Sequence, residues 1–87
     1  MLWTVKRTDP FLKDLKAYRK NYVLLQELDD KIKRLAEDPL VIGGELSGNF
    51  VGKKSTRLAG KFRLIFKIDE KEKVVYLLVL DHRGKVY

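Results

Sequence analysis

The first half of the chain has apolar residues at the spacing of one helical face. Four of them follow one another at positions i, i+4, i+7 and i+11: Phe11, Leu15, Tyr18 and Tyr22. Asp9 and Pro10 precede this stripe and indicate a helix start. Asp9 suits the N-cap, and Pro10 suits the first helical position, where its missing N–H costs nothing. The pattern therefore predicts a helix that begins at this point.

A second helix is predicted over residues 22–37, where the same apolar spacing recurs: Leu24, Leu28, Ile32 and Leu35. Asp38 and Pro39 end it, because the residue before a proline is pushed out of the α region. Residues 2–6 include aromatic and β-branched side chains and predict a short strand ahead of the two helices. The first half thus reads as a strand followed by a helical hairpin.

After Pro39 the helical period disappears and glycines punctuate the chain. From residue 62 the period is two, with one face formed by Phe62, Leu64, Phe66 and Ile68. A charged turn at residues 69–73 leads into an apolar run at residues 74–80, which is typical of a central strand. We predict an α+β fold in one domain spanning residues 1–87: an N-terminal strand, a helical hairpin, then an antiparallel sheet of three or more strands with the helices packed on one face.

Composition excludes several classes of protein. The 87 residues include no cysteine and one histidine, which rules out a disulfide framework and makes a structural zinc site improbable. No apolar run is long enough to cross a bilayer, and the N-terminus does not resemble a secretion leader. The expectation is a cytoplasmic protein with no membrane partner and no cofactor.

Positive charge is concentrated in the second half. Residues 1–48 carry nine Lys/Arg against eight Asp/Glu, whereas residues 49–87 carry ten against four, a net of +6. A polyanion is the natural partner of such a surface, because Lys and Arg neutralise phosphates and release counterions. The competing interpretation is that the lysines only keep a small domain soluble.

The second half also resembles a known family. Residues 55–66, Ser-Thr-Arg-Leu-Ala-Gly-Lys-Phe-Arg-Leu-Ile-Phe, are similar to the strand–turn–strand core of the RelE/ParE superfamily. The likeness continues through the apolar run at residues 74–80 and ends at residues 82–87, His-Arg-Gly-Lys-Val-Tyr, which resemble the family's closing segment. The resemblance implies a RelE-like toxin of a type II toxin–antitoxin system. Members of the RelE type cut mRNA in the ribosomal A site without a metal, and an antitoxin holds them inactive.

The resemblance also implies catalytic residues. Arg63 falls at the family's strand arginine and would stabilise the scissile phosphate; the alternative is an exposed arginine in a surface salt bridge. Arg83 would contact the phosphate or protonate the leaving group, unless it is simply a charged residue at a fraying end. Tyr87 would stack on a base or act as a base, although here it is the last residue.

Further candidates are a histidine and four basic residues. Imidazole titrates near neutral pH in its unperturbed form, so chemistry nominates His82 as acid or base; a structural histidine is an equal alternative. Relatives carry RNA-contacting basic residues in the region that here holds Lys53, Lys54, Arg57 and Lys61. The competing interpretation of these four is a solvated loop.

Two alternatives to the nuclease remain open. ParE-like members share the fold and inhibit DNA gyrase without cutting RNA, and a non-catalytic nucleic-acid-binding domain is the other possibility. A metal nuclease is rejected, because neighbouring acids in a helix or a turn do not converge on one point; the acids concerned are Asp29, Asp30, Asp69 and Glu70. The expected partners are mRNA, the ribosome and a cognate antitoxin, and the sequence gives no oligomeric state.

Overall fold

A computed structural model of the chain describes residues 2–45 and 52–82. Its elements follow in the order β1 (Thr4–Arg7), α1 (Asp9–Ala17), α2 (Tyr22–Glu37), the 3-10 turn η1 (Pro39–Val41), β2 (Gly44–Glu45), β3 (Lys54–Leu58), β4 (Phe62–Asp69) and β5 (Val74–His82). The predicted α+β class and order of elements are confirmed.

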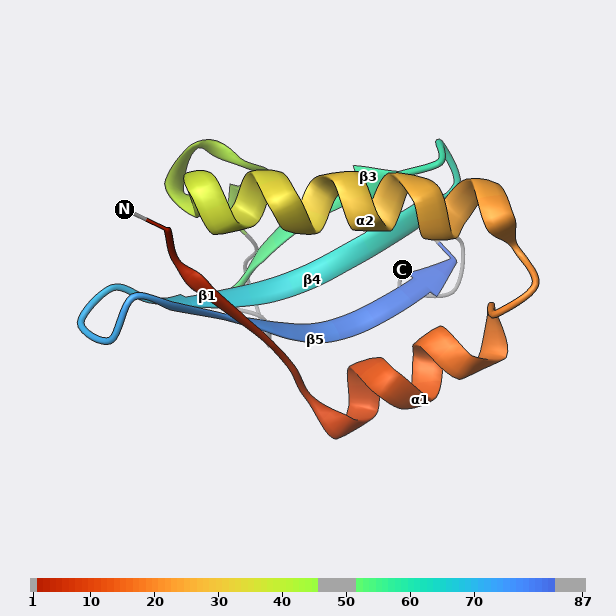
Figure 1. The fold of residues 1–87 in the computed structure, drawn as a ribbon, viewed down its shortest axis with the longest axis horizontal. Helices are drawn as coiled ribbons and strands as arrows, with labels where there is room; N and C mark the ends of the chain where they lie inside the picture. The colour runs from red at the N-terminus through yellow and green to blue at the C-terminus, as the bar shows by residue number, and fades with distance from the viewer. Residues whose placement is uncertain (1, 46–51, 83–87) are drawn as a thin grey trace.

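The strands form a five-stranded sheet in the order β1-β5-β4-β3-β2. Strands β2 to β5 pair antiparallel, as predicted. Strand β1 pairs parallel to β5, from Thr4 opposite Val74 to Arg7 opposite Leu77, so the sheet is mixed. The N-terminal strand therefore lies beside the C-terminal strand, at the edge of the sheet (Figure 1).

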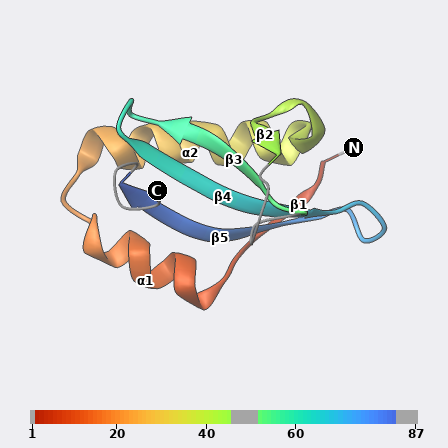
Figure 2. The same cartoon turned by 180° about the vertical axis from the view of Figure 1, so that it is seen from behind.

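The core lies between the sheet and the helices. Helix α2 crosses the sheet over β3 and β4, and α1 lies beside β5 (Figure 1). The side chains that meet there form one cluster: Phe11, Leu24, Leu28, Leu35, Ile42, Leu58, Phe62, Leu64, Phe66, Val75, Leu77 and Leu80. Phe62, Leu64 and Phe66 confirm the predicted period of two in β4. The residues between them point to the outer face of the sheet, the side away from α2, which Figure 2 shows in front.

The start of α1 differs from the prediction by one residue. Thr8, not Asp9, is the N-cap, and its Oγ1 accepts a hydrogen bond from the Phe11 N–H at 3.5 Å. Thr8 also donates its hydroxyl to the Leu77 carbonyl oxygen at 2.7 Å, a contact with β5 that local sequence does not reveal. The bounds predicted for α2 are confirmed, with Asn21 as its N-cap.

A bulge in β5 explains the unbroken apolar run. Ile65 pairs with Val79, but Phe66 pairs with Leu77, so Leu78 is the extra residue. Leu77 and Leu80 consequently both reach the core. Leu78 and Val79 line a hollow of about 450 Å³, together with Thr8, Pro10, Lys53 and Ile65.

Helix α1 completes the edge of β5 where β1 ends. Pairing with β1 stops at Leu77, and the backbone N–H groups of later residues need other acceptors. Asp14 supplies one: its Oδ2 accepts from the Leu80 N–H at 3.0 Å. One turn further on, Tyr18 reaches the next part of the strand through Asp81. The side chains of α1 therefore hold the end of β5, where several candidate site residues lie.

Candidate active site

Three charged side chains form a row across the sheet. Arg57 on β3 pairs with Arg63 on β4, and Arg63 pairs with Asp81 on β5. Residues directly opposite in antiparallel strands share a face, with Cβ atoms about 4.5–5.5 Å apart. Arg63 lies between the core residues Phe62 and Leu64, so the row is on the outer face.

The row has the electrostatic character of an anion site. Two arginines directly opposite each other repel, and Asp81 adds one carboxylate at the β5 end of the row. A phosphate between the guanidinium groups would relieve this repulsion. Guanidinium groups bind phosphate oxygens bidentately and stay charged at every relevant pH.

The Asp81 carboxylate is held by one of its two oxygens. The Tyr18 hydroxyl donates to Oδ1 at 3.1 Å, and the His82 backbone N–H donates to the same atom at 2.7 Å. Among the described residues, no hydrogen bond to Oδ2 is found. The carboxylate is thus fixed toward α1 through one oxygen, at the edge of β5.

Tyr18 is itself fixed by an aromatic contact. Its ring forms a T-shaped contact with the Phe62 ring at a centroid distance of 4.9 Å, and the Phe62 ring forms a second T-shaped contact with the His82 ring at 5.5 Å. Burial, followed by the hydrogen bond to Asp81 and its negative charge, raises the pKa of Tyr18. The phenol therefore remains a donor to Asp81 at neutral pH.

This shift predicts how stability depends on alkaline pH. A raised pKa means that folding favours the protonated phenol. The contribution of Tyr18 to stability is therefore complete below its unfolded-state pKa of about 10, and it is lost as the pH rises through its folded-state pKa. We expect the melting temperature of the wild type to fall more steeply above about pH 10 than that of Tyr18→Phe. Thermal unfolding of both proteins between neutral and alkaline pH measures this difference. Parallel curves for the two proteins would contradict it.

His82 leaves the sheet on the opposite side from Arg63. It pairs with Phe62, whose ring is part of the core, and its own ring contacts that ring. The register thus separates the candidate acid or base His82 from the row of Arg57, Arg63 and Asp81. Arg83 and Tyr87 lie outside the described residues, and their roles remain predictions.

The four basic candidates are divided between the two faces. Arg57 is exposed within the row, and Lys53 lines the outer-face hollow. Lys54 pairs with the core residue Phe66, and its Nζ donates to the Leu40 carbonyl oxygen at 3.0 Å. Lys61 is exposed in the turn between β3 and β4. Two of the four therefore lie on the face of Arg63.

Comparisons with known proteins identify the family. A family model described as the ParE toxin of the type II toxin–antitoxin system parDE matches residues 5–87. The chain belongs to this toxin family. The resemblance to the RelE/ParE superfamily is thereby confirmed, and the protein is a toxin of a type II toxin–antitoxin system.

Individual relatives of this toxin agree with the assignment. Toxin RelG of Mycobacterium tuberculosis is 30% identical over 87 residues, which are 100% of this chain and 98% of RelG. A chain in the RelBE2 toxin–antitoxin complex of the same organism is 29% identical, with a TM-score of 0.81 over 95% of this chain and 100% of that one. YafQ of Escherichia coli, at 16% identity, shares the fold, with a TM-score of 0.81 over 98% of both chains.

Sequence reasoning missed two residues of this arrangement, Tyr18 and Asp81. Tyr18 was assigned to the apolar face of the first helix, and nothing local indicates that its hydroxyl reaches a residue 63 positions away. Asp81 could have been found only through the pairing of β4 with β5, which places it directly opposite Arg63.

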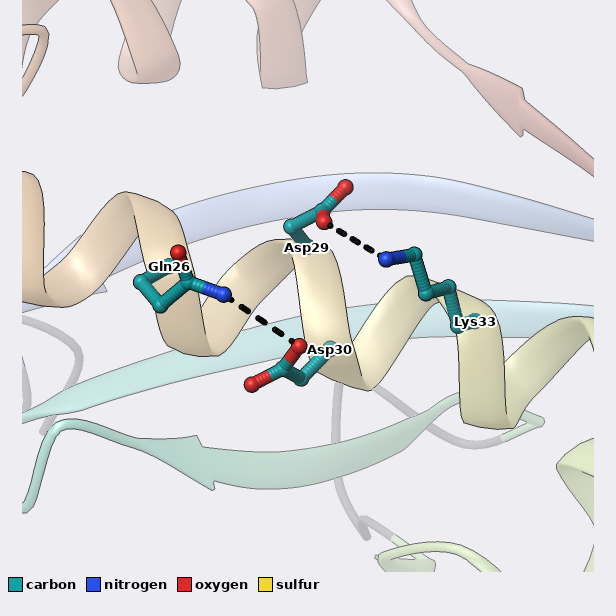
Figure 3. A network of polar contacts seen from close by, with 4 residues as sticks. All are labelled: Gln26, Asp29, Asp30 and Lys33. Carbon is teal, nitrogen blue, oxygen red and sulfur yellow. Dashed lines mark hydrogen bonds and ion pairs between the residues drawn. The ribbon is translucent and has the colours of Figure 1, made fainter.

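The acidic residues of α2 do not converge on a metal. Asp29 forms an ion pair with Lys33 at 3.2 Å, and Gln26 donates to Asp30 at 3.4 Å, both along the exposed helix surface (Figure 3). Within residues 2–45 and 52–82, no group of three or more His, Cys, Asp or Glu side chains is placed to hold an ion. None of the described helices is long and apolar enough to span a membrane.

Proposed function

We propose that this toxin is a metal-independent endoribonuclease that cuts mRNA on the ribosome and so inhibits translation. The observation that carries the proposal is the outer-face row of Arg57, Arg63 and Asp81. A pair of guanidinium groups beside a carboxylate suits a phosphodiester, whose negative charge increases as it is cleaved. The excess of positive charge in residues 49–87 supports a polyanionic substrate.

The proposed reaction is attack of an RNA 2′-hydroxyl on the adjacent phosphate. Arg63 and Arg57 stabilise the charge that develops on the phosphate oxygens. Arg83, Tyr87 and His82 are the candidates for proton transfer and base stacking that the family resemblance supplies. Lys53, Lys54 and Lys61 are proposed contacts to the rest of the RNA. Of these three, Lys53 is supported by its place on the same face as Arg63.

The direct test is primer-extension mapping of a message on programmed ribosomes incubated with the toxin. Cuts within the A-site codon are the expected result, and free RNA serves as the control for ribosome dependence. The description of the matching family favours one competitor, a ParE-like inhibitor of DNA gyrase. Intact message together with inhibition of gyrase supercoiling would replace the nuclease with that function.

We also propose that a cognate antitoxin binds this toxin, as RelBE2 of M. tuberculosis is a toxin–antitoxin complex. A hollow of about 350 Å³ on the helical hairpin suits such a partner; its lining consists of Leu12, Leu15, Lys16, Arg19 and Leu25. Leucines with two cations beside them complement an amphipathic segment that carries acidic residues next to its apolar face. An acidic amphipathic segment of the antitoxin is therefore the proposed occupant.

Leu12→Glu is expected to weaken antitoxin binding at least about tenfold, which corresponds to ~1.4 kcal/mol. The Leu12 side chain is 44% exposed, so it has apolar area left to bury, and a carboxylate there would repel an acidic partner. The matched control is Leu40→Glu, because Leu40 is 48% exposed but lies on η1, away from this hollow. Calorimetric titration with the cognate antitoxin measures both, and equal affinities for the two variants would contradict this docking surface.

A further inference from the structure

The candidate site needs a proton acceptor on the same face as its arginines. The phosphate is expected between Arg57 and Arg63, so a group that takes the 2′-hydroxyl proton must be near that row. His82 pairs with Phe62 and leaves the sheet by the other face. The described residue that meets the requirement is Asp81, directly opposite Arg63.

The surroundings of Asp81 prepare one oxygen for this role. Two hydrogen bonds to Oδ1, from the Tyr18 hydroxyl and from the His82 N–H, fix the orientation of the carboxylate. Oδ2 accepts no hydrogen bond from the described residues, and the side chain is partly exposed. A carboxylate whose orientation is fixed through one oxygen keeps its other oxygen for a second contact, which is the preorganisation that a general base needs.

The neighbouring acidic group is not equivalent. Asp14 lies on α1 one turn before Tyr18, but its Oδ2 accepts the Leu80 N–H and so completes the edge of the sheet. The Tyr18 hydroxyl donates a hydrogen bond to Asp81, so its role is to position the carboxylate and not to accept a proton from the substrate. Asp81 is thus distinguished from the nearby titratable side chains by its row with the arginines and by its open oxygen.

We propose that Asp81 is the general base of this toxin, with Tyr18 as its positioning residue; the inference rests on the proposed RNA cleavage. Oδ2 takes the proton of the 2′-hydroxyl while the 2′-oxygen forms a bond to phosphorus. The bond from phosphorus to the 5′-oxygen breaks, and that oxygen takes a proton from solvent. The products are a 2′,3′-cyclic phosphate and a 5′-hydroxyl, and Asp81 then returns its proton to solvent.

Asp81→Asn and Asp81→Ala test this assignment on programmed ribosomes. Asparagine keeps an Oδ1 that can accept both hydrogen bonds, so the fold and Tyr18 stay in place while the base is lost. We expect kcat to fall about 10²- to 10⁴-fold in both variants, with KM unchanged or lower because the site becomes more positive. Formate should restore cleavage by Asp81→Ala in proportion to its concentration, since it fits the vacated space, but should not restore Asp81→Asn.

The matched control is Asp30→Asn, which removes the same charge from the exposed surface of α2 (Figure 3). Its kcat should equal that of the wild type. Wild-type cleavage combined with an Asp81→Asn kcat within about threefold of wild type would overturn the inference and leave the proposed function standing. Absence of cleavage by folded wild-type toxin would overturn both.

Discussion

Replacing Arg63 with alanine is expected to lower the kcat of RNA cleavage about 10²- to 10³-fold. Arg63 is the central member of the row, between Arg57 and Asp81, so in the proposed cleavage its guanidinium is the group assigned to the scissile phosphate. Loss of a preorganised donor to a developing charge acts on the transition state more than on binding. Single-turnover cleavage on programmed ribosomes, with saturating toxin, measures the change.

Two further variants sharpen this test. Arg63→Lys keeps the charge but loses the bidentate geometry, so it should restore only part of the rate. Arg34→Ala removes an exposed arginine from α2, on the other side of the sheet, and its kcat should match the wild type. An Arg63→Ala enzyme as fast as Arg34→Ala would show that the row does not hold the reacting phosphate.

Phe11→Ala is expected to lower the free energy of unfolding by about 3–5 kcal/mol, the largest effect on stability that we predict. Phe11 is fully buried and is the buried residue of α1, so it joins that helix to the core. Truncation removes its apolar contacts and leaves a cavity under the helix. Because small proteins are stabilised by only ~5–15 kcal/mol, the variant should unfold at a much lower urea concentration.

Leu12→Ala is the matched control, one position further along the same helix. Its side chain is 44% exposed, and truncation there should cost no more than about 1 kcal/mol. Urea unfolding followed by circular dichroism gives both values. A small loss of unfolding free energy for Phe11→Ala, comparable to that for Leu12→Ala, would mean that the packing of α1 against β5 does not depend on Phe11.

Much of the fold follows from local patterns. The predicted bounds of the second helix coincide with α2, because its apolar spacing and the Asp38–Pro39 stop are both encoded within a few residues. The period of two from Phe62 to Ile68 gives β4 and also places Arg63 on the opposite face. The cap of α1 was misplaced by one residue, because Thr8 is selected partly by its bond to Leu77, far along the chain.

The site divides in the same way. The sequence alone indicated the type II toxin family, the charged second half and two of the candidate residues, Arg57 and Arg63. Only the tertiary structure placed Asp81 opposite Arg63, turned His82 to the other face and joined Tyr18, the C-cap of α1, to Asp81 of β5. The physical reason is that side-chain periodicity is local, whereas strand register, the β5 bulge and the docking of α1 depend on long-range pairing and packing.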